Sequence, residues 1–301
     1  MTKRTFAFFA LVAFLFAVPS APAQQAPAPE SRPSPAQGAQ GLPNPELAWS
    51  MLSDNAAPGR SSHDRIEAMA ALGSMGKDEQ AARLIGPAII EHNSDVRIAA
   101  ILAAGEAKNP ALVPQLQAAL DDDNAQVAYT AALTLWKMHD TSGEDLLLAV
   151  ASGDRKAKPG LMKSEKHKAA KELHSPKTMT MLAVNQASGY FLGPFGIGLK
   201  AIEVVNKNSG APIRAATIDE LAKQHSDAVR ETLIDDLTDP EPAVRAAAVK
   251  GLGNWPGEET ARQIYPLFGD THLAVRLTAA AAYLRVLKPG AEPANTGAGA
   301  Q

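Results

Sequence analysis

The sequence predicts an all-α fold, an α-solenoid of stacked helical hairpins interrupted by a central segment that does not repeat. Similar segments recur about every 31 residues, which is the period of a repeat made of two helices. Within each repeat, apolar residues lie four apart and so share one helix face. No segment shows the sustained alternation of apolar and polar residues that is typical of strands.

The N-terminus has the pattern of an export signal. Lys3 and Arg4 precede an apolar run, and Ala21-Pro22-Ala23 has the small residues that signal peptidases recognise. We expect residues 1–23 to be a signal peptide cleaved after Ala23, which places the mature chain in the periplasm or outside the cell. Residues 24–43 are rich in Pro, Ala and Gln and predict a disordered linker.

The second helix of most repeats is marked by an arginine, which in four of them follows Val or Ile. Val244-Arg245 and Val275-Arg276 are 31 residues apart, and Asp239 and Asp270 each precede their arginine by six positions. Ile213-Arg214 lies another 31 residues before Arg245. In the N-terminal half, Val96-Arg97 precedes Val127-Ala128 by the same 31 residues, and Arg65 lies 32 before Arg97. We therefore expect these arginines and aspartates to hold equivalent places in successive repeats.

The first helix of each repeat is marked by a pair of apolar residues four positions apart. The pairs are Ile85 and Ile89, Leu116 and Leu120, Leu233 and Leu237, and Ile264 and Phe268. A single hairpin cannot bury such a face alone, whereas stacked neighbours bury a continuous core. The repeats are expected to fill residues 44–152 and 200–287, with a disordered tail at 288–301.

On these residues the chain resembles a bacterial HEAT-repeat protein of the short-repeat type that is also seen in phycobilin lyases. The resemblance covers about residues 44–142 and 200–287. It implies a structural ladder in which the aspartates and arginines pair between adjacent repeats. The residues that this ladder would use are Asp239, Arg245, Asp270, Arg276, Arg97, Arg214 and Arg65.

The central segment, residues 153–199, departs from the repeat. From Arg155 to Lys177 there are eight basic and two acidic residues, and Thr178 to Leu199 carry no charge. A basic helix beside an apolar stretch is typical of a contact with an anionic partner or membrane surface, although a solvated lysine face has the same composition. The candidate partner-binding residues are Lys163, Lys166, Lys168, Lys171, Lys177, Tyr190, Phe191 and Phe195.

Several short matches to nucleotide-binding and metal-binding motifs lie in sequence surroundings that do not fit those sites. Gly196 and Gly198 begin a G-x-G-x-x-A match, but helical repeats rather than a strand flank it, so we expect no nucleotide or other cofactor. Asp121 to Asn124 lack the alternation of a calcium loop and are expected to cap a helix. We expect no metal site, and Trp136 and Trp255 are expected in the core.

The amino-acid composition excludes some classes of chemistry and of binding partner. The chain has no cysteine, which excludes disulfides and thiol chemistry, and its mature form carries a net charge of −5, which argues against nucleic acid. The sequence therefore favours a non-enzymatic scaffold of the bacterial periplasm or cell envelope that binds a protein partner. The alternatives are a peripheral membrane protein that contacts lipid through residues 155–199 and, more remotely, a lyase-like enzyme.

Overall fold

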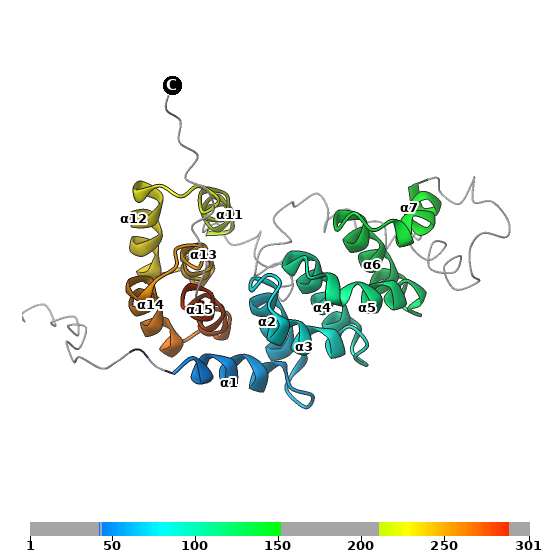
Figure 1. Ribbon diagram of the computed structural model, residues 1–301, viewed down its shortest axis with the longest axis horizontal. Coiled ribbons are helices and arrows are strands. Elements are labelled where there is room, and N and C mark those ends of the chain that lie inside the picture. Colours follow the sequence, from blue (N-terminus) through cyan, green and yellow to red (C-terminus); the bar gives the residue numbers. More distant parts are fainter. Residues whose placement is uncertain (1–41, 43, 152–210, 289–301) are drawn as a thin grey trace, which may run out of the picture. The chain divides into compact units, whose positions relative to one another are not determined.

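Two arrays of helices make up the part of the chain that the structure, a computed structural model, describes: residues 42, 44–151 and 211–288 (Figure 1). The N-terminal array contains α1 (Pro45–Ala56), α2 (Ser62–Gly73), α3 (Glu79–Ala88), α4 (Ser94–Ala107), α5 (Val113–Ala118), α6 (Ala125–Lys137) and α7 (Glu144–Ala151). The C-terminal array contains α11 (Ala211–Leu221), α12 (Asp227–Asp235), α13 (Pro242–Leu252), α14 (Glu258–Ile264) and α15 (Leu273–Val286). The fold class is confirmed, because the described residues form helices and no strand.

Consecutive helices pair as hairpins, and the hairpins stack (Figure 1). Helices α3, α5, α12 and α14 each pack against the helix that follows them, and we call these the outer helices. The following helices, α4, α6, α13 and α15, pack against one another or against α2 and α11, and we call this whole set the inner helices. Three of the outer helices run into a 3-10 turn, at Ala119–Asp121, Asp236–Thr238 and Tyr265–Gly269.

Polar side chains fix where the inner helices begin. Asn93 accepts hydrogen bonds from the backbone N–H groups of Asp95 and Val96, and so caps α4. Asn124 does the same for α6, as expected for the acidic turn before it. These bonds satisfy N–H groups that have no partner inside the helix.

The core is a continuous layer between outer and inner helices. The paired apolar residues of the outer helices are buried except for Phe268, which is partly buried, and Ile85, Leu116 and Ile264 are fully excluded from solvent. The inner helices contribute mainly alanine, which lets neighbouring helices approach closely. At Gly73 of α2 an added Cβ would lie 2.9 Å from the Cα of Ala103 in α4, a distance at which only glycine fits.

The two arrays meet through the first and last repeats of the chain. Helix α15 packs against both α1 and α2, so the inner helices follow one another in space as α11, α13, α15, α2, α4 and α6. We call the contact of α15 with α1 and α2 the seam. Lys288, just after α15, forms an ion pair across it with Asp78, the residue that caps α3.

Candidate functional site

The ladder arginines link each repeat to the next. Arg245 donates from Nε and Nη2 to the two carboxylate oxygens of Asp270, at 2.7 and 2.9 Å. Its Nη1 donates to the carbonyl oxygens of Asp239 and Pro240 in its own repeat, at 2.7 and 3.1 Å. One side chain therefore ties the turn of its own hairpin to the turn of the following one.

The ion pair with the following repeat recurs along both arrays. Arg97 pairs with Asp122 at 2.8 Å, and Arg214 pairs with Asp239 at 2.6 Å. Arg65 pairs with Glu91 at 2.7 Å, so a glutamate replaces the aspartate in that repeat.

At the end of the C-terminal array the ladder stops. Among the described residues Arg276 bonds only the carbonyl oxygens of Asp270 and Thr271.

The arginines hold the ladder acids in their charged form. Burial by itself raises the pKa of Asp270, but hydrogen bonds from Arg245 and from the backbone N–H of His272 bring the pKa below its usual value. Asp239 behaves in the same way beside Arg214. The charges of Arg97, Arg214 and Arg245 are each matched by an aspartate of the following repeat, so these pairs act as a structural device.

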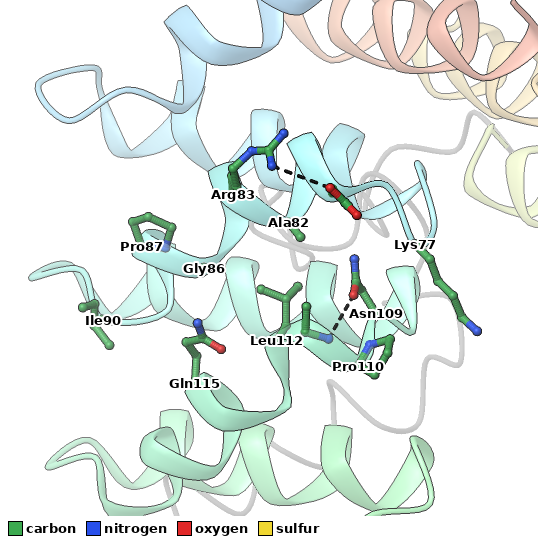
Figure 2. A pocket seen from close by; sticks show the side chains of 12 residues that line it. Lys77, Ala82, Arg83, Gly86, Pro87, Ile90, Asn109, Pro110, Leu112 and Gln115 are labelled. Carbon is green, nitrogen blue, oxygen red and sulfur yellow. Dashed lines mark hydrogen bonds and ion pairs between the residues drawn. The ribbon is translucent and has the colours of Figure 1, made fainter. Parts of the chain in front are cut away.

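A groove opens on the outer side of the N-terminal array, between α3 and the segment from Pro110 to α5 (Figure 2). Its volume is about 770 Å³. Figure 2 shows Ile90 and Lys77 at opposite ends, with Leu112 between them. The lining residues are Lys77, Glu79, Ala82, Arg83, Gly86, Pro87, Ile90, Asn109, Pro110, Ala111, Leu112 and Gln115.

The groove has an apolar floor and polar ends. Leu112 is buried at the floor, whereas 74% of Ile90 is exposed to solvent. Pro87 has no N–H group and so leaves the carbonyl oxygen of Arg83 without its helical donor. These features suit an extended peptide, which brings both apolar side chains and backbone donors.

The charged side chains beside the groove form only weak, exposed interactions with one another. Arg83 lies 3.8 Å from Glu79, and both side chains are largely exposed. Lys77 is exposed at the end of the groove and points away from the Arg83–Glu79 pair (Figure 2). A carboxylate on a bound segment would therefore find a cation there without displacing an existing buried pair.

A second charged group lies where side chains of the inner helices meet, and we call it the inner charge cluster. It consists of Asp219 on α11, Lys250 on α13, Arg285 on α15 and Glu106 on α4. Lys250 Nζ lies 2.6 Å from Glu106 Oε1. Arg285 donates to the side chain of Asn254 and to the carbonyl oxygen of Lys250.

Burial shifts the pKa values of two members of the inner charge cluster. It raises the pKa of Asp219, an effect that Lys250 partly offsets. It lowers the pKa of Arg285, which Glu106 partly offsets.

Glu67 of α2 is the most perturbed carboxyl group that the structure describes. The residue is 6% exposed, and burial together with the nearby charge of Asp64 raises its pKa to about 7. It follows Arg65 by two positions, where the equivalent residues Ala99 and Ala247 are small and apolar. Sequence reasoning missed Glu67, although this mismatch with the other repeats was visible in the sequence.

The candidate partner-binding residues from the sequence lie outside the described residues. Lys163, Lys166, Lys168, Lys171, Lys177, Tyr190, Phe191 and Phe195 all fall within 152–210. Trp255 is partly buried against the core, but Trp136 is 49% exposed, so the expectation of a core position was wrong for Trp136. It lies in the last turn of α6, where the described N-terminal array is nearly at its end.

Within 44–151 and 211–288, no three His, Cys, Asp or Glu side chains are grouped so that they could hold a metal ion. In those same ranges no helix has the length and apolar character needed to span a bilayer.

Comparison with known proteins identifies the type of repeat. A family model described as HEAT repeats matches residues 57–136, 87–158 and 200–285. No curated protein matches the chain. Among solved structures, human deoxyhypusine hydroxylase in complex with glycerol is similar, with a TM-score of 0.32 and 15% identity over 80% of this chain and 96% of that one.

Proposed function

Because the chain belongs to the HEAT-repeat family, we propose that it is a non-enzymatic scaffold that binds a protein partner in the periplasm or cell envelope of a bacterium. Repeat arrays of this kind present extended surfaces that are used for binding. The signal-like N-terminus supports the location, and the groove between α3 and α5 supports the mode of binding.

The observation that carries the proposal is the exposed Ile90 at one end of an apolar groove. A partner segment that covers Ile90 and lies over Leu112 would bury apolar surface that is otherwise in contact with water. Lys77 at the other end would pair with an acidic residue of that segment. The proposed partner is therefore a protein with an exposed extended segment that is apolar and acidic.

The test is affinity capture with the mature chain, followed by measurement of binding to the recovered partner. Ile90→Arg and Lys77→Glu should each weaken binding, by about tenfold or more for Ile90 if it is an anchor residue. Leu148→Arg is the matched control, because Leu148 is also a large exposed apolar residue, 58% exposed, but lies on α7 away from the groove lining. Equal binding by all variants would remove the groove from the proposal.

The basic central segment is a second proposed contact. Reversal of the charges of Lys163, Lys166, Lys168, Lys171 and Lys177 should weaken capture if this segment also binds the partner. Flotation of the mature chain with anionic vesicles separates a protein contact from a lipid contact, since only the lipid contact moves the protein with the vesicles.

Export has its own test. The mature protein recovered from the envelope fraction should begin at Gln24, which the intact mass and N-terminal sequencing both report. An intact Met1 in the purified cellular protein would contradict cleavage after Ala23.

A further inference from the structure

Among the contacts between neighbouring repeats in the described ranges, the seam differs in how the chain crosses it. Elsewhere, adjacent inner helices are joined through one short outer helix, as α2 is joined to α4 through α3. At the seam the packed helices are α15 and α2, and the ion pair Lys288–Asp78 joins residues 210 positions apart. Opening the seam would therefore break no turn of the repeat, whereas opening any other contact would.

The inner charge cluster crosses this same contact. The Lys250–Glu106 pair joins α13 to α4, although α15 and α2 lie between them in the packing order. The positions equivalent to Lys250 on those two helices are Ala281 and Ala70, and both are buried. Small side chains at these positions leave room for Lys250 and Glu106 to meet above them.

Lys250 has a second acid within electrostatic reach on its own side of the seam. Asp219 occupies the equivalent position one repeat earlier, and its charge interacts with that of Lys250. The Asp219 side chain is half-buried and has no hydrogen-bond partner among the described residues. Lys250 thus lies between Glu106, with which it forms an ion pair, and Asp219, which accepts no hydrogen bond from a described residue.

We propose that Lys250 is a two-position ionic latch that pairs with Glu106 when the seam is closed and with Asp219 when the seam is open. In the closed state the pair holds α13 and α4 together across the seam. In the open state Asp219 keeps the ammonium group of Lys250 paired, which lowers the cost of separating the arrays. Opening would expose the faces of α1, α2 and α15 that the seam covers.

The latch predicts that substitutions of the two acids shift the seam in opposite directions. Glu106→Gln removes the closed partner and should shift the equilibrium toward the open state. Asp219→Asn removes the open partner and should shift it toward the closed state. Each shift should amount to up to about fivefold in the ratio of open to closed molecules, as expected for a partly exposed ion pair.

Because the chain has no cysteine, two engineered cysteines suffice to follow the seam by energy transfer between fluorophores. Gln80 on α3 and Glu231 on α12 are exposed and lie in different arrays. In the full mature chain labelled at these positions, raising NaCl should increase the open population, because salt screens the Lys288–Asp78 pair, which has no replacement in the open state. Glu258→Gln is the control, since Glu258 pairs with Arg262 on the surface of α14 alone.

Opposite shifts for Glu106→Gln and Asp219→Asn would support the latch. Shifts in the same direction, or none with salt or with either variant, would overturn it. The double reversal Lys250→Glu with Glu106→Lys provides a second check. It restores the pair across the seam and places like charges at 219 and 250, so it should be more closed than Lys250→Glu alone. A double variant that is as open as Lys250→Glu alone would contradict the latch.

Discussion

Arg245 of α13 donates hydrogen bonds to both carboxylate oxygens of Asp270, at 2.7 and 2.9 Å, and thereby joins one repeat to the next. The remaining Nη1 of Arg245 holds two backbone carbonyls of the preceding turn. The side chain thus fixes a distance between repeats as well as the shape of one turn. Its loss is expected to affect stability across the whole C-terminal array.

Arg245→Met should lower the free energy of unfolding by about 3 kcal/mol, because it leaves Asp270 charged and partly buried without its partner. Chemical denaturation followed by circular dichroism measures this. Arg262→Met is the matched control, since Arg262 pairs with Glu258 on an exposed surface, and it should change stability by less than about 0.5 kcal/mol. A similar decrease in the free energy of unfolding for both variants would show that the buried ladder pair stabilises the fold no more than an exposed pair.

The ladder acids should make the protein sensitive to acid. Asp239, Asp270 and Glu91 have pKa values below their ordinary values of 3.8, 3.8 and 4.5. In that window the unfolded chain binds more protons than the folded chain, so stability is full above the ordinary values and is lost as the pH falls through the lowered ones. Denaturation midpoints measured from pH 5 downward should fall, and Asp239→Asn with Asp270→Asn should flatten that dependence.

Glu67 should have the opposite effect. Its pKa rises from 4.5 to about 7 on folding, so the folded chain binds more protons between these values and stability falls as the pH rises through them. The loss should approach about 3 kcal/mol above pH 7. Glu67→Gln should remove this slope and be more stable than the original protein at pH 8. Glu79→Gln, at an exposed position on α3, should leave the slope unchanged.

The close approach of α2 and α4 makes Gly73 intolerant of any side chain. Gly73→Ala places a methyl group 2.9 Å from the backbone of Ala103 and should cost about 1–3 kcal/mol by forcing the helices apart. Gly269→Ala is the control, because nothing lies within 4 Å of its added Cβ. Thermal unfolding should show a clear loss for the first variant and little change for the second.

The repeat itself was predictable because its signals are local and recur. The 31-residue spacing and the pairs such as Ile85 and Ile89 depend only on helix geometry, and every member of those pairs except the partly buried Phe268 is buried in the structure. Asn124 was predictable as a cap for the same reason, since capping is decided within three residues. The family match to HEAT repeats agrees with the resemblance drawn from these patterns.

The seam was not predictable, because no periodicity says that the last repeat packs on the first. Lys250 and Glu106 are far apart in sequence and occupy positions that are typical of solvated helix faces. The groove likewise depends on the spacing of two outer helices, which Ile90 and Leu112 do not encode individually. Trp136 was expected in the core on residue type alone, but 49% of it is exposed, and residue type does not say which face of a helix a side chain occupies.

The most direct test of the proposed scaffold function is crosslinking from the groove in the cell that makes the protein. A photoreactive amino acid at position 90 should form an adduct with one protein, and mass spectrometry should place the crosslink in an extended, apolar and acidic segment of that protein. Lys77→Glu should reduce the adduct, and the same photoreactive group at position 148 should not form it. Adducts at 148 but none at 90, or an adduct at 90 that is insensitive to Lys77→Glu, would contradict binding in the groove.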